Sequence, residues 1–118
     1  MIKAQAEAVK RYYDDKAFAV SAYLAWDKQD RTEMDRVYDQ YKRTEAYERI
    51  PYVPAPAIQY VLDHPSDEKT AEQLRAFDFH KVVDNTLIDR LVKEGFFEKL
   101  FGPTIKTEQT RKAKLAYR

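Results

Sequence analysis

Two histidines, each near an aspartate, are the residues best suited to metal binding. His64 follows Asp63, and His80 lies two residues after Asp78. Zinc sites usually place two ligands within a turn of one another and add a third. Here the histidines are sixteen residues apart and cysteine is absent. The spacing therefore favours histidines with no metal role, and we expect no metal site and no cofactor.

The paired acids are better explained as helix-end residues than as catalytic carboxylates. The pairs are Asp14 with Asp15 and Asp27 with Asp30, and both lie between segments with helical periodicity. Carboxylates stabilise the start of a helix, whereas general acid–base catalysis needs burial and a raised pKa. The chain also has no nucleophile elbow, phosphate-binding glycine loop or dinucleotide fingerprint. We expect no catalytic residue and no enzymatic activity.

Aromatic residues gather in the first part of the chain and could form a binding surface. Such rings build ligand boxes, partner surfaces, or the core and rim of a helical domain. Their helical spacing favours core and rim. Adjacent tyrosines cannot share one helix face, so some apolar surface is expected to stay uncovered. The residues are Tyr12, Tyr13, Tyr23, Trp26, Tyr38, Tyr41 and Tyr47.

The elements that hold these residues are predicted to be helices. The only glycines, Gly95 and Gly102, each follow a helix-patterned stretch, where a left-handed residue ends a helix at little cost. A sheet protein of this length needs tight turns rich in Gly, Asn and Asp pairs, which are missing. We expect an all-α chain of six to seven short helices with one extended, proline-rich crossing segment.

Periodicity and capping residues locate these helices. Asp30 precedes Glu33 by three residues and predicts an N-cap. Ser66 is expected to cap a later helix, and Asp84 or Asn85 another. The expected helices cover 2–14, a segment containing Phe18 and Trp26, the charged segment after Asp30, a segment after Pro56, one after Ser66, and one that stops at Gly95. The proline-rich segment 49–56 is expected to be extended. The segment 77–83 alternates in its first half, a pattern compatible with an extended conformation there.

Composition indicates a folded chain without an overall electrostatic field. Aromatic residues make up 14%, which argues against disorder, and the formal net charge is +1. A basic stretch follows Pro103, but only Tyr117 could stack a base there, so we interpret it as a solvated helix face or tail and expect no nucleic acid. The chain contains no long apolar run, so we expect no membrane insertion.

We divide the chain into a helical domain at 1–101 and a basic helix or tail at 102–118. The basic residues of the second part are Lys106, Arg111, Lys112, Lys114 and Arg118.

Several segments together resemble a known family ending. They are the opening run IKAQAEAV at 2–9, a helix containing Phe18 and ending near Trp26, a charged helix with Tyr38 and Tyr41, the run PYVPAPAIQYVLD at 51–63, and the run VVDNTLIDRLVKEGF at 82–96. In this order they resemble the C-terminal third of ABC-transporter substrate-binding proteins of the nitrate, sulfonate, taurine and thiamine-precursor group. The resemblance covers about residues 1 to 101.

The resemblance implies a role in transport. Members of the family are two-lobed α/β proteins that bind a small solute in a cleft and deliver it to a permease. The chain would be the C-terminal helical portion of such a solute-binding component, for a small anionic or thiamine-precursor-like solute, and would not bind it alone. The resemblance implies the missing N-terminal lobe and an ABC permease as partners. It implies a periplasmic or lipid-anchored extracytoplasmic location for a full-length member. The chain itself shows no signal peptide, so we expect it in the cytoplasm if it is expressed alone.

An alternative is a free-standing helical protein-interaction module that is oligomeric. Either way, helices without their covering lobe should leave an apolar strip exposed and self-associate, with a two-fold dimer as the simplest form. The candidate interface residues are Tyr13, Trp26, Phe96, Phe97 and Phe101. Ligand-binding residues are not assigned, because the family's contacts lie mostly on the part that is missing here.

Overall fold

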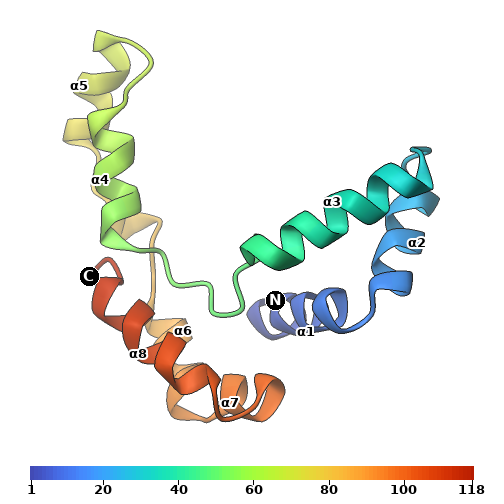
Figure 1. The fold of residues 1–118 in the computed structure, drawn as a ribbon. Coiled ribbons are helices and arrows are strands. Elements are labelled where there is room, and N and C mark those ends of the chain that lie inside the picture. The colour runs from blue at the N-terminus through green and yellow to red at the C-terminus, as the bar shows by residue number, and fades with distance from the viewer. The chain divides into compact units, whose positions relative to one another are not determined.

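The computed structural model describes residues 1–118, and its regular elements are helices (Figure 1). This confirms the predicted all-α class. No strand forms, and an isolated bridge joins Pro54 to Ala116. None of the helices is long and apolar enough to cross a membrane. The elements are α1 (Ile2–Asp14), α2 (Lys16–Trp26), α3 (Arg31–Thr44), α4 (Ala55–Asp63), α5 (Glu68–Ala76), the 3-10 turn η1 (Phe79–Lys81), α6 (Thr86–Lys93), α7 (Phe96–Phe101) and α8 (Ile105–Leu115).

The chain forms two compact units, Met1–Arg49 and Ile50–Arg118. The first contains α1 to α3, and the second contains α4 to α8. The division therefore falls near residue 50 and not at the expected boundary after residue 101. The basic segment is the helix α8, which packs on α7 and buries Ile105 and Gln109. It belongs to the second unit and is not a separate tail.

Aspartate side chains cap two helices of the first unit, α2 and α3. The Asp15 carboxylate accepts a hydrogen bond from the Phe18 backbone N–H at 2.9 Å, which begins α2 directly after α1. The Asp30 carboxylate accepts from the Glu33 N–H at 3.0 Å and begins α3, as the sequence predicts. These caps satisfy N–H groups that have no partner inside the helix. They also produce the sharp turns that let α2 pack against both α1 and α3.

One local prediction for the second unit is wrong and another holds only in part. The cap of α5 is Asp67, whose carboxylate accepts from the Thr70 N–H at 2.7 Å, and not Ser66. In the segment 77–83, Phe77 and Asp78 are extended, but Phe79–Lys81 form a 3-10 turn, because the Asp78 carboxylate accepts from the His80 N–H at 3.1 Å. An aspartate that captures a nearby backbone N–H outweighs a short alternating pattern. The two glycine positions agree with prediction, since Gly95 and Gly102 have φ angles of 73° and 92°.

Asn85 joins three segments of the second unit. The sequence predicts Asp84 or Asn85 as the cap of α6: Asn85 is at the N-cap position, and the Asp84 carboxylate accepts the hydrogen bond from the Thr86 N–H. The Asn85 side chain makes no cap hydrogen bond. The Asn85 amide oxygen accepts from the Val53 N–H at 2.9 Å, and its NH₂ group donates to the Val53 and Tyr117 carbonyls, each at 2.9 Å. Asn85 is only 5% exposed. It therefore ties the proline-rich segment and the end of the chain to the start of α6.

A polar cluster of Tyr52, Asp89 and Arg118 joins the same three segments of the second unit. The Tyr52 hydroxyl donates to the Asp89 carboxylate at 2.7 Å, and the Arg118 guanidinium binds the same carboxylate with a 3.0 Å contact. Arg118 holds the pKa of Asp89 below its usual value. Burial, followed by the Asp89 carboxylate, raises the pKa of Tyr52 to about 12. At neutral pH the cluster is an ion pair with one neutral phenol attached.

We predict that Asn85→Ala lowers the free energy of unfolding by about 2 to 3 kcal/mol, because the Val53 N–H and the Tyr117 carbonyl lose the amide that binds them. Urea unfolding followed by circular dichroism measures the change. Val82→Ala, at an exposed position nearby, is the control and should change stability by less than about 0.5 kcal/mol. Equal stability of Asn85→Ala and the unaltered chain would show that this amide does not hold the unit together.

Candidate functional site

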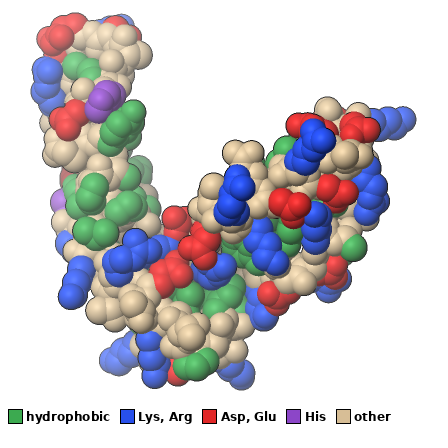
Figure 2. All heavy atoms as spheres, in the orientation of Figure 1, with side chains coloured by type: hydrophobic (Ala, Val, Ile, Leu, Met, Phe, Trp, Pro, Cys, Tyr) green, Lys and Arg blue, Asp and Glu red, His purple; other side chains and the backbone are tan.

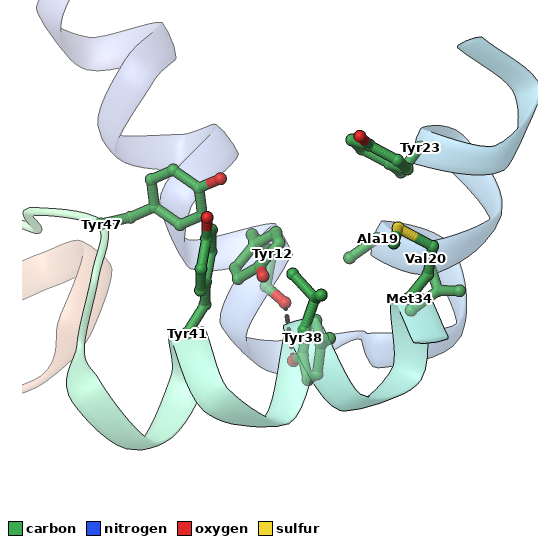
Figure 3. A pocket seen from close by; sticks show the side chains of 9 residues that line it. Tyr12, Ala19, Val20, Tyr23, Met34, Tyr38, Tyr41 and Tyr47 are labelled. Atoms are coloured by element: carbon green, nitrogen blue, oxygen red, sulfur yellow. Dashed lines mark hydrogen bonds between the residues drawn. The ribbon is translucent and has the colours of Figure 1, made fainter. Parts of the chain in front are cut away.

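A tyrosine-lined pocket lies within the first unit, between α1, α2, α3 and the segment after α3 (Figure 3). Its volume is about 260 Å³, slightly below the usual range of about 300 to 1,000 Å³ for ligand pockets. It is therefore suited to a small ligand. Its lining consists of aromatic and aliphatic side chains without a charged residue: Tyr12, Ala19, Val20, Tyr23, Met34, Val37, Tyr38, Tyr41 and Tyr47.

Helical spacing places these side chains around one space. On α3, Met34, Val37, Tyr38 and Tyr41 recur at intervals of three and four residues, so they share a face. On α2, three lining residues lie within five positions, at 19, 20 and 23. Figure 3 shows Tyr23 on one side of the pocket and the rings from α1, α3 and the following segment on the other.

The hydroxyl of Tyr38 fixes the inner wall. It donates to the backbone carbonyl of Tyr12 at 2.8 Å and also lies 3.1 Å from the carbonyl of Tyr13. These carbonyls belong to the last turn of α1, where carbonyl groups lack partners within the helix. Tyr38 is 3% exposed, so the contact is buried. It joins the end of α1 to the middle of α3.

The adjacent residues Tyr12 and Tyr13 point to different surroundings, as expected from their positions on one helix. Tyr13 is buried, and its hydroxyl donates to the Tyr47 carbonyl and accepts from the Tyr47 N–H, both at 2.9 Å. This fixes the segment that carries the Tyr47 ring. Tyr12 instead lines the pocket beside Tyr38 and Tyr47, with ring centroids 4.9 and 4.8 Å away. Tyr41 completes the aromatic wall at 5.7 Å from Tyr47.

The phenols of Tyr12, Tyr38 and Tyr47 have raised pKa values and are neutral at physiological pH. Burial raises the pKa of Tyr12 to about 12, reinforced by the neighbouring phenols, first that of Tyr47. Burial also raises the pKa of Tyr47. A neutral phenol with so high a pKa is a poor general base and a poor nucleophile. The pocket has the properties of a binding site rather than a catalytic one.

The pocket has a buried base and an exposed mouth. Val20 and Tyr38 are buried at its base, whereas Tyr23, Tyr41 and Tyr47 are exposed to solvent. No hydrogen bond within the chain uses the hydroxyls of these three exposed tyrosines. A ligand could therefore enter past them without breaking a hydrogen bond of the fold.

The histidines that the sequence analysis considered lie on the surface of the second unit and do not meet. His64 stacks on Tyr60 at 4.1 Å between ring centroids, and the His80 ring lies 3.0 Å from the Asp78 carboxylate. The backbone of Arg118, followed by Asp78, raises the pKa of His80. No group of three or more His, Cys, Asp or Glu side chains is arranged to hold a metal ion.

The five candidate interface residues fall into three classes. Trp26 is 82% exposed. Phe96 and Phe101 are half-buried. Tyr13 and Phe97 are buried, and Phe97 is 0% exposed, so these two cannot act as accessible anchors. Their apolar surface completes the cores of their own units, because each unit has few other large side chains with which to build a core.

Comparison of the chain with models of protein families, with curated proteins and with solved structures found no match.

We predict that Tyr38→Phe lowers the free energy of unfolding by about 1 to 2 kcal/mol, because the last-turn carbonyls of α1 lose their buried donor. Tyr41→Phe is the matched control. It removes a hydroxyl that makes no hydrogen bond within the chain and should leave stability unchanged within about 0.5 kcal/mol. Urea titration of both variants checks this. Equal stability of the two variants would mean that the buried hydroxyl does not join α1 to α3.

Proposed function

We propose that this chain is the C-terminal helical portion of a solute-binding component of an ABC transporter, whose solute is small and anionic or similar to a thiamine precursor. The sequence resemblance over about residues 1 to 101 is the basis for the family. The all-helical fold and a pocket without acid–base groups are compatible with binding rather than catalysis.

The observation that carries the proposal is the exposed apolar surface of each unit. Large apolar side chains are exposed in both, including Trp26 in the first and Tyr60, at 65%, in the second. Figure 2 shows hydrophobic side chains gathered along α4. An open groove of mixed polarity lies there between α4, α5 and the following segment. Its apolar lining includes Ile58, Leu62, Leu74 and Phe77, and its polar lining is Gln59, Asp63 and Arg75. Single exposed apolar residues are ordinary, but a gathered set is typical of a surface that another part covers.

A sheet-containing lobe would cover such a surface in a complete solute-binding protein. Small anionic solutes need several polar groups that converge from two sides of a cleft. The tyrosine pocket has only phenol hydroxyls and no cationic side chain. The anionic solute would therefore bind mainly to the rest of the protein, and these helices would support that lobe.

We predict that the isolated chain binds none of nitrate, a sulfonate, taurine or a pyrimidine with a dissociation constant below about 1 mM, as measured by calorimetric titration. A longer protein, encoded by a reading frame that continues upstream through a βαβ-rich lobe, should bind one of them tightly. Micromolar binding by the isolated chain would contradict the proposed division of labour. An upstream sequence that encodes no such lobe would contradict the transport function itself.

A free-standing, oligomeric interaction module is the second candidate, and one observation favours it. Trp26 is the most exposed aromatic ring, and Tyr23 lies beside it with ring centroids 6.2 Å apart. Paired aromatic rings at the surface are the residues that most often anchor protein interfaces. They lie at the end of α2, where a second copy of the chain could contact them.

We predict that the chain sediments at high micromolar concentration as a dimer of twice its 14.0 kDa mass, and that Trp26→Ala shifts it toward the monomer. Tyr60→Ala, which removes an exposed ring from the other unit, is the matched control for a general loss of aromatic surface. A 14 kDa monomer for the unaltered chain would refute self-association. An equal shift for both variants would exclude Trp26 as the specific anchor.

A further inference from the structure

We propose that the tyrosine pocket of the first unit binds a small organic cation, a quaternary or tertiary ammonium group, between the rings of Tyr12, Tyr23, Tyr41 and Tyr47. This goes beyond the transport role and does not rest on it, because every residue involved lies within Met1–Arg49. It concerns a ligand of opposite charge to the anionic solutes considered above.

Ring geometry is the first argument. The face of an aromatic ring is electron-rich and attracts a cation within about 6 Å of the ring centroid. Four pocket rings come from separate segments and stand around one space (Figure 3). Tyr12 and Tyr47 meet edge to face, with planes 78° apart, and Tyr41 meets Tyr47 at 72°. Rings at right angles to one another form the walls of a box rather than a stacked slab.

The chain's own cations supply the second argument. Three aromatic rings of the first unit each lie under a basic side chain: Arg11 is 4.3 Å from the Phe18 centroid, Arg49 is 4.6 Å from Tyr13, and Lys16 is 5.6 Å from Tyr38. The structure places no such cation over the four rings of the box. Those rings have the same electronic character and remain available to a cation from solution.

The charges around the pocket do not oppose a cation. The Lys16 ammonium, which lies over the ring of the pocket-lining Tyr38, is paired with the Asp39 carboxylate at 2.8 Å. The negative charges of Asp14 and Asp15 also contribute to the raised pKa of Tyr38. On the surface, Asp14 pairs with Lys10 and Asp15 pairs with Arg11. An anion would meet electron-rich ring faces and no positive charge inside. The remaining rival is an uncharged ligand that fills the cavity only through its apolar walls.

Titration with choline, a quaternary ammonium alcohol, tests the proposal at constant ionic strength. Its control ligand is neohexanol, which has the same shape but carries carbon in place of the charged nitrogen. Calorimetry or NMR shift perturbation should give choline a dissociation constant of about 0.1 to 1 mM and show at least tenfold weaker binding of neohexanol. Equal affinity for the two, or no binding of choline, would overturn the proposal.

Substitutions of the pocket tyrosines test whether choline binds between these rings. Tyr41→Leu, at the exposed mouth, should weaken choline binding roughly tenfold, whereas Tyr41→Phe keeps the ring and should change it less than about threefold. Tyr60→Leu removes an exposed ring from the second unit and should have no effect. Circular dichroism confirms that each variant is folded. Unchanged affinity in Tyr41→Leu and in Tyr47→Leu would place the cation elsewhere and refute the assignment.

Discussion

The first unit depends on a buried hydrogen bond from the Tyr38 hydroxyl to the last turn of α1. A unit of this size has few buried apolar side chains, and α1 ends with carbonyls that need a donor. One phenol provides both apolar area and the donor. It thereby sets the position of Tyr12, whose ring forms the centre of the pocket wall. Without this bond, α1 could rotate against α3 and the box would lose a side.

Local features of the sequence predict much of this arrangement. The Asp30 cap, the end of α2 near Trp26 and the glycine after α6 each depend on neighbours within a few residues, so their chemistry is visible in the sequence. Asn85 shows that long-range contacts cannot be predicted in this way. Its partner Val53 lies 32 positions away, and nothing in a local pattern indicates that an asparagine will bind distant backbone instead of capping its own helix.

The sequence predicts which aromatic residues cluster in the first unit, but not that they surround a pocket. The clustered tyrosines are evident in the sequence, and their helical spacing favours core and rim over a ligand box or a partner surface. The structure divides them among these roles: Tyr13 and Tyr38 are buried, Tyr12 and Tyr41 line a cavity, and Trp26 faces solvent. The division depends on how α2 turns back on α1 and α3, which side-chain spacing within one helix does not determine.

The most direct test of the cation box is the contact between ligand and ring protons. In the complex with choline, two-dimensional NMR should show Overhauser effects from the trimethylammonium protons to the ring protons of Tyr12, Tyr41 and Tyr47. Trp26 and Tyr60 lie outside the pocket and serve as internal references. Contacts to the three pocket rings alone would support the account. Contacts to Trp26 or Tyr60 and none to Tyr12 would contradict it.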